Sequence, residues 1–150
     1  MRAALIEARK NLVVFDGGPF GACVVKNGRL ISVGRNTVLK NDATCHAEIN
    51  AIRAASKKLK TYNLSGCVIY STTEPCPMCF SAIHWARIDT VVFGTTIADV
   101  GKRGFNELKI SASSLNRLGK AGIKIIPCFL RDECLSLLID WDSLPEKQLY

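Results

Sequence analysis

The sequence predicts an α/β fold, a three-layer α/β/α sandwich built around one mixed sheet. Short apolar runs typical of strands alternate with longer helical segments, which places helices over both faces of a sheet. Asn27-Gly28 separates two strand-like runs and predicts a hairpin, because both positions of such a turn need positive φ. Part of the sheet is therefore antiparallel. The length of 150 residues corresponds to one domain with a sizeable core.

The first half of the chain begins with a predicted helix over residues 1–14. Its apolar stripe consists of Leu5, Ile6, Leu12 and Val13. Residues 16–19, Asp-Gly-Gly-Pro, end this helix. The strands of the hairpin are expected over 22–25 and 30–33. A helix over 45–59 follows, because this stretch is rich in alanine, the best helix former.

The second half of the chain continues the alternation. The expected elements are a strand over 67–70, a helix over 76–86, a strand over 90–93, a helix over 111–120, a strand over 124–126 and a helix over 131–141. Pro77 suits the first turn of its helix, where a missing N–H breaks no hydrogen bond. Gly119 or Gly122 ends the helix that begins near residue 111.

Composition excludes several classes of protein. Hydrophobic residues make up 48% of the chain, which excludes a disordered tail, and no apolar run approaches the ~18 residues that a membrane span needs. Glu7 interrupts the first ten residues, unlike the apolar stretch of a secretory signal, so we expect a cytoplasmic protein without a membrane partner.

Lysine and arginine outnumber aspartate and glutamate by 20 to 13, which gives a net charge of +7. Such an excess can serve nucleic-acid binding. Here the basic residues are scattered from Arg2 to Lys147, and the densest patch, residues 57–60, has no interleaved aromatic residue. A solvated surface is the favoured interpretation, and a nucleic-acid partner stays as an alternative.

Seven cysteines is an odd number, which disfavours a secreted disulfide scaffold and fits free thiols or metal ligands. Five of them lie among apolar neighbours and are expected to be small buried hydrophobes: Cys23, Cys45, Cys67, Cys128 and Cys134. The remaining two, Cys76 and Cys79, belong to a motif.

That motif combines His46 with Pro75-Cys76-Pro77-Met78-Cys79. Zinc takes thiolates and imidazole nitrogen in a tetrahedral array, and three protein ligands leave one position open, as in catalytic zinc sites. We expect His46, Cys76 and Cys79 in the first turns of two helices, with Thr44 as a cap, so that both helix dipoles favour the thiolates.

Glu48 lies two residues beyond the expected ligand His46. A carboxylate at this spacing can lie beside the metal without binding it, take a proton from zinc-bound water and pass it to a leaving group. Two alternatives to a catalytic zinc site stay open: a structural zinc site, and a redox pair made by Cys76 and Cys79. The joint pattern is more specific than either half, because His-x-Glu followed by Pro-Cys-x-x-Cys is typical of zinc deaminases.

Beyond this motif, several further stretches carry a resemblance to known proteins. They are Gly18-Pro19-Phe20-Gly21-Ala22, Gly34-Arg35-Asn36, Ala51-Ile52-Arg53, Glu74, Ala82-Ile83-His84-Trp85-Ala86-Arg87, Gly104-Phe105 and Tyr150. With them the chain resembles the cytidine-deaminase-like superfamily of zinc deaminases, most closely the bacterial guanine deaminases. The resemblance implies a central sheet of about five strands. It also implies Zn²⁺ held by His46, Cys76 and Cys79, and Glu48 as the proton shuttle.

By the same resemblance, hydroxide attacks C2 of guanine and gives xanthine and ammonia. The residues implied in substrate binding are Phe20, Asn36, Ala47, Trp85, Glu107 and Tyr150. Members of the guanine branch carry an acidic residue shortly after Gly-Phe that recognises the base. Here Glu107 is available with a longer side chain, which leaves the identity of the substrate open. The resemblance further implies a homodimer in which the tail, residues 131–150, is exchanged, so that Tyr150 covers the partner's site.

Three functions stay open at this point. A deaminase of a small purine substrate, most of all guanine, is favoured, and a nucleoside such as guanosine or cytidine belongs to the same class. The second candidate is a tRNA adenosine deaminase, which shares the metal motif and needs an open groove for a flipped nucleotide. The third is a non-catalytic zinc module for interaction, which predicts a fourth protein ligand and no role for Glu48.

Overall fold

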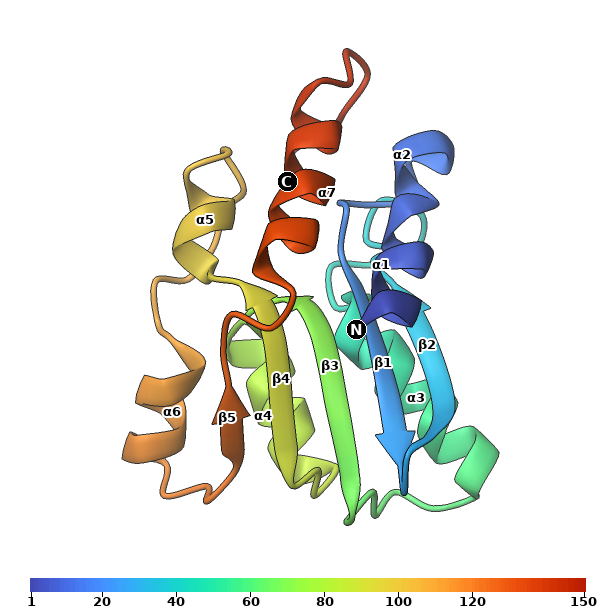
Figure 1. The fold of residues 1–150 in the computed structure, drawn as a ribbon, viewed down its shortest axis with the longest axis vertical. Helices are drawn as coiled ribbons and strands as arrows, with labels where there is room; N and C mark the ends of the chain where they lie inside the picture. Colours follow the sequence, from blue (N-terminus) through green and yellow to red (C-terminus); the bar gives the residue numbers. More distant parts are fainter.

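The computed structural model describes all residues, 1–150, and contains one five-stranded sheet (Figure 1). Its strands are β1 (Gly21–Lys26), β2 (Arg29–Arg35), β3 (Cys67–Thr73), β4 (Thr90–Thr95) and β5 (Lys124–Ile126). Their order across the sheet is β2-β1-β3-β4-β5. β1 runs antiparallel to β2 and β3, whereas β3, β4 and β5 are parallel. The predicted mixed sheet is confirmed.

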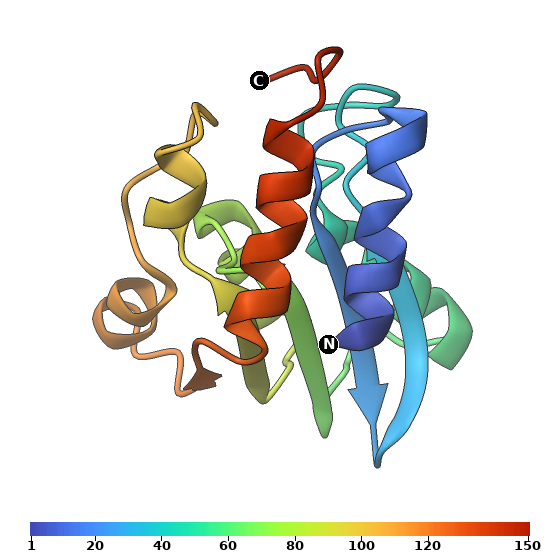
Figure 2. The same cartoon turned by 45° about the horizontal axis from the view of Figure 1, so that its top comes forward.

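Helices cover both faces of this sheet. They are α1 (Arg2–Arg9), α2 (Asn11–Val14), α3 (Ala47–Leu59), α4 (Pro77–Trp85), α5 (Ile97–Gly101), α6 (Ala112–Leu118) and α7 (Arg131–Asp142). α3 and α4 lie on one face, and Figure 2 shows α1 and α7 side by side on the other. The predicted three-layer sandwich is therefore confirmed. None of the helices combines the length and the apolar composition that a membrane span requires.

The hairpin between β1 and β2 has the predicted turn. Asn27 and Gly28 adopt φ values of 49° and 74°, the left-handed conformation that the tight turn needs. Val24 pairs with Ser32, and the register shifts between Val24 and Val25. β1 thus pairs with β2 on one side and with β3 on the other. β2 is therefore the edge strand, and it lies against α3.

The main core lies between the sheet and the layer of α3, α4 and α6. Ile69, Ile83 and Val91 are fully buried there, and burial of each such side chain contributes roughly 1.5–3 kcal/mol. On the opposite face Leu5 packs with Leu137, which joins α1 to α7. Both faces of the sheet are therefore covered, as the apolar runs of the parallel strands predict.

The N-terminal helix differs from the prediction. The helix expected over 1–14 divides into α1 and α2, because the amide of Lys10 bonds back to Glu7 and the Asn11 side chain turns inward. Half of the predicted apolar stripe is wrong, since Ile6 and Val13 are 66% and 77% exposed. Asn11 is instead fully buried, and its amide donates to the carbonyl oxygens of Gly18 and Asn36.

A short helix, α5, was not predicted. It begins with a capping box in which Thr96 Oγ1 accepts from the amide of Asp99 and the Asp99 carboxylate accepts from the amide of Thr96. Only five residues follow this start, too few to show a helical period in the sequence. The position of α5 matters because it lies at the carboxyl end of β4, beside the site described next.

Candidate metal centre and active site

Two helices begin at the site, one after each half of the motif. His46 is the N-cap residue of α3 and Cys76 is the N-cap residue of α4, both with extended backbone. Pro77 occupies the first helical position, as predicted. The predicted cap was wrong: the Thr44 hydroxyl bonds to Asp42 instead, because His46 itself takes the cap position. The ligands therefore lie at two helix N-termini.

The structure brings His46, Cys76 and Cys79 together, with their donor atoms all within 4.8 Å of one another. Cys76 Sγ lies 3.7 Å from His46 Nδ1. A tetrahedral zinc with ordinary Zn–S and Zn–N bonds separates two such donors by about 3.6 Å, so the donor set and its spacing fit zinc. No fourth His, Cys, Asp or Glu belongs to this cluster. Three protein ligands are typical of a catalytic site and not of a structural one.

The two thiols differ in their affinity for a proton. A hydrogen bond from Cys79, together with His46, lowers the pKa of Cys76 to about 4 despite burial. The same contact with Cys76, followed by burial and the nearby Glu48 carboxylate, raises the pKa of Cys79 well above its ordinary value. The two shifts have opposite directions because the thiol of Cys79 donates to the sulfur of Cys76. Binding of a divalent cation would require both thiols to be deprotonated.

Glu48 lies in the first turn of α3 and is only 6% exposed. Its Oε1 accepts a hydrogen bond of 3.0 Å from the Ser71 hydroxyl, and its Oε2 lies 3.5 Å from Cys79 Sγ. Burial raises the pKa of Glu48 above its ordinary value, because a low-dielectric environment disfavours the charged form. A buried carboxyl beside a metal centre has the properties of a proton-transfer group.

A cavity opens beside these residues, and four of the predicted substrate contacts line it: Phe20, Asn36, Glu107 and Tyr150. Asn36 is almost fully buried, and its side-chain oxygen accepts from the amide of Val38, which leaves its NH₂ group for another acceptor. The Glu107 carboxylate makes no hydrogen bond or ion pair within the chain. Burial, followed by the nearby Cys76, raises the pKa of Glu107.

The C-terminal residue closes one side of the cavity. The hydroxyl of Tyr150 accepts a hydrogen bond of 2.9 Å from the amide of Gly18, and its backbone oxygen accepts from the amide of Asn106. Phe105 packs edge-on against both Phe20 and Tyr150, with ring centroids 5.0 and 5.8 Å apart. Tyr150 is thus held at two ends over the site of its own chain.

Two of the predicted contacts do not reach the cavity. Trp85 is 75% exposed and is the last residue of α4, about 9 Å along the axis from Cys79 and about 14 Å from Cys76. Ala47 is fully buried in the main core behind His46.

Three lining residues were missed from the sequence. They are Ser71, Thr73 and Glu74. All three belong to the polar run at the end of β3 and directly after it, just before Pro75 and Cys76. That position is the signal that identifies them, since the carboxyl ends of parallel strands are where α/β proteins place their sites.

Comparison with known proteins identifies the family. The family model described as the cytidine and deoxycytidylate deaminase zinc-binding region matches residues 1–95. The guanine deaminase of Bacillus subtilis (strain 168) is 48% identical over 92 residues, which is 61% of this chain and 59% of that protein. The tRNA-specific adenosine deaminase of Buchnera aphidicola subsp. Schizaphis graminum is 38% identical over 121 residues, 80% of this chain and 77% of that one.

Among solved structures, the guanine deaminase from Nitrosomonas europaea superposes with a TM-score of 0.86 at 32% identity, over 95% of this chain and 82% of that one. These relatives share the fold but differ in the substrates for which they are named. Since the family model covers more than half of the chain, and the three donor atoms lie together as a zinc site requires, the chain belongs to the zinc-binding cytidine and deoxycytidylate deaminase family, whose members hydrolyse C–N bonds.

Proposed function

We propose that this protein converts guanine and water to xanthine and ammonia. The observation that carries the proposal is that the side-chain NH₂ group of Asn36 and the carboxylate of Glu107 line the same cavity as Glu48 and two of the metal ligands, His46 and Cys76. The relatives named guanine deaminase support the same substrate.

The hydrogen-bonding groups in the cavity complement guanine. Guanine presents N–H donors at N1 and at its 2-amino group, and acceptors at O6 and the ring nitrogens. The Glu107 carboxylate only accepts hydrogen bonds when ionised, so it pairs with the donor edge, while the Asn36 NH₂ group pairs with a ring acceptor. Adenine has an acceptor at N1, and Glu107 therefore disfavours it. Phe20 supplies an aromatic surface for the planar base.

The reaction needs one proton moved from water to the departing nitrogen. Zinc, when bound by His46, Cys76 and Cys79, would activate water as a Lewis acid. Glu48 takes the proton from the attacking water and delivers it to the amino nitrogen. A C2–O bond forms, the C2–N bond breaks and ammonia leaves. Ser71 holds Oε1 of Glu48, which leaves Oε2, 3.5 Å from Cys79 Sγ, as the oxygen beside the metal ligands.

Tyr150 controls access to this site. With Tyr150 in place the cavity measures about 30 Å³, room for two or three waters at ~10–15 Å³ each and too little for a purine. We propose that the tail opens to admit the base and then closes over it.

We also propose that the protein is a homodimer in which tails are exchanged between subunits. The exchanged tail would be residues 131–150, which comprise α7 and the segment from Ser143 to Tyr150 that follows it.

A second candidate is deamination of adenosine in tRNA. It is favoured by the 38% identity to a tRNA-specific adenosine deaminase over 77% of that protein, and by the net charge of +7. The two functions differ in salt dependence. Binding to RNA weakens steeply as salt rises because counterions are released, whereas turnover of a neutral base barely changes.

The proposal is tested by measuring ammonia release from the zinc-loaded protein. The panel consists of guanine, guanosine, adenine, cytosine, cytidine and a tRNA anticodon stem-loop, each at low and high salt. Ammonia from guanine, equal at both salt concentrations, is the expected result. Ammonia from the stem-loop alone, lost at high salt, would replace the guanine proposal with the tRNA one.

A further inference from the structure

Glu74 links three parts of the site, although it is neither a metal ligand nor one of the predicted contacts. It directly follows β3 and precedes Pro75 and Cys76, and its backbone amide donates to the carbonyl oxygen of Thr95 at the end of β4. Its side chain is only 8% exposed and makes no ion pair. A buried carboxylate without a cation requires other partners to offset its desolvation.

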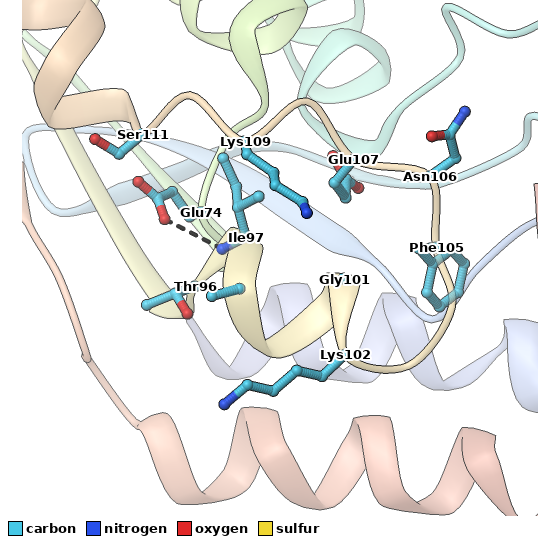
Figure 3. Close-up of a pocket in the computed structure, with 11 residues that line it drawn as sticks. Glu74, Thr96, Ile97, Gly101, Lys102, Phe105, Asn106, Glu107, Lys109 and Ser111 are labelled. Carbon is cyan, nitrogen blue, oxygen red and sulfur yellow. Dashed lines mark hydrogen bonds between the residues drawn. The ribbon is translucent and has the colours of Figure 1, made fainter.

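Those partners are the first amides of two different helices. Oε2 of Glu74 accepts from the amide of Ile97, the first residue of α5, at 3.1 Å (Figure 3). Oε1 accepts from the amide of Ala112, the first residue of α6, at 2.9 Å. The first amides of a helix have no partner inside the helix, and a negative charge there is favoured by the dipole. One carboxylate therefore serves two helix starts at once.

The segment between these two helices carries residues of the site. Figure 3 shows Phe105 and Glu107 on the chain that runs from α5 to α6. From residue 105 to 110 this chain forms no helix or strand, and its only backbone amide bond to a distant residue is the one from Asn106 to Tyr150. The placement of Glu107 therefore depends on how the two ends of the segment are anchored.

We propose that Glu74 is a positioning residue for substrate specificity: by holding the starts of α5 and α6, it keeps Glu107 at a set distance from the metal centre. Glu74 is well placed for this because it is two residues from Cys76, so the same stretch of backbone carries the metal ligand and the anchor. The inference rests on the proposed function, in which Glu107 recognises the base.

Hydrogen–deuterium exchange on the substrate-free protein tests the anchor without any activity assay. In Glu74→Gln the amide nitrogen replaces one acceptor oxygen, so one helix start loses its partner. We expect exchange of the amides of Ile97 and Ala112, and of Asn106 between them, to become at least about tenfold faster, as loss of a hydrogen bond to a charged group implies. Unchanged exchange there would overturn the proposal. Glu74→Asp, which keeps the charge but is too short to reach both helices, is the second variant and should show the same increase.

Asp99→Asn is the matched control. It weakens the capping box of α5 but does not touch the start of α6, so exchange should rise near residues 97–101 and stay unchanged at residue 112. If Asp99→Asn accelerates residue 112 as strongly as Glu74→Gln does, the effect reflects general loosening and the proposal is wrong.

Kinetics then test whether the anchor acts through Glu107. Glu74→Gln should raise KM for guanine about tenfold with one zinc per chain retained, and should have no further effect in the Glu107→Gln background. Additive effects of the two substitutions would contradict a positioning role. An inactive wild-type protein would instead refute the proposed function, while the exchange experiment would still decide the role of Glu74 as an anchor.

Discussion

Ser71 donates a 3.0 Å hydrogen bond to Oε1 of Glu48, and both side chains are buried. The bond joins the sheet, through β3, to the first turn of α3. It occupies one carboxylate oxygen and leaves the other 3.5 Å from Cys79 Sγ. The proton acceptor of the proposed reaction is thus fixed by a residue from a different element, which limits the orientations that Glu48 can adopt.

Replacing Glu48 with glutamine should remove activity but not the metal. Glutamine keeps the shape and cannot take a proton from water, so we expect kcat to fall by about 10²–10⁴-fold, the usual contribution of a general acid–base group. Ser71→Ala should show a smaller loss of kcat with KM unchanged. Ammonia release and zinc content per chain are the measurements. A fully active Glu48→Gln protein would favour a non-catalytic zinc module.

Removal of a ligand should remove zinc. In Cys79→Ser one of three protein ligands is lost. Loss of a residue that only hydrogen-bonds to a ligand lowers metal affinity about 10–100-fold, so loss of the ligand itself should lower the affinity for zinc by more. Metal analysis after dialysis measures this, and the apo protein should unfold at a lower temperature because zinc binds the folded state. Cys128→Ser is the control, since Cys128 lies outside the cluster and is exposed; the prediction that it is buried is wrong. Equal zinc in both variants would show that Cys79 is not a ligand.

The sequence could predict the part of the site whose residues are close together in the chain, but not the part that only the folded chain brings together. His46, Glu48, Cys76 and Cys79 lie at short spacings at two helix starts, so their relative geometry follows from local structure, and the structure brings them together. Trp85 shows the opposite case. It belongs to the same helix as Cys79, but its spacing in the sequence does not reveal that the cavity lies at the other end of that helix.

The fold follows the same rule. The hairpin at Asn27 and the strand Lys124–Ile126 were predictable from turn chemistry and apolar runs. The contacts of Ser71 and Glu74 with α3, α5 and α6 join residues 23 to 38 positions apart, and no periodic pattern encodes them. Asn11 lies within the helix predicted over 1–14 and is no member of its predicted apolar stripe, yet it is fully buried because it satisfies two carbonyl groups of the loops beside β1 and β2.

Two glycines near α5 and α7 should respond in opposite ways to alanine. A Cβ at Gly94 would lie 2.3 Å from Cys134 Sγ and 2.8 Å from the carbonyl oxygen of Thr72, so Gly94→Ala should destabilise the fold by about 1–3 kcal/mol. A Cβ at Gly101 meets nothing within 4 Å, and Gly101→Ala should be neutral or stabilising by up to ~1 kcal/mol. Urea unfolding of both variants measures this. Equal stability of the two would contradict the close packing of α7 on β4.

Stability should depend on pH through Asp99. A hydrogen bond from Arg131, at 2.7 Å, and the cap of α5 hold the pKa of Asp99 well below its ordinary value. The folded state therefore binds this proton less readily than the unfolded state, so the pair stabilises the protein at neutral pH. That contribution is lost as the pH falls below the unfolded value of about 3.9 toward the folded one.

The urea midpoint of Asp99→Asn should accordingly lie below that of the wild type at pH 7, and the difference should shrink at pH 3. Lys10→Gln, which removes an exposed contact with Glu7, serves as the control and should show no comparable difference. A midpoint difference for Asp99→Asn that is the same at both pH values would contradict the assignment.

Exchange of tails between subunits predicts complementation. One chain carries Glu48→Gln with an intact Tyr150, and the other carries Tyr150→Ala with an intact Glu48. Each alone should be impaired, because the first lacks the proton acceptor and the second lacks the residue that Gly18 and Phe105 hold over the cavity. If tails are exchanged, mixed dimers restore one complete site, and random pairing restores about half of the sites that keep Glu48. Activity after co-refolding should therefore exceed the sum of the two separate preparations. If Tyr150 serves only its own chain, as the contact with Gly18 within one chain permits, mixing will add nothing, and sedimentation at micromolar concentration will then show whether a dimer exists at all.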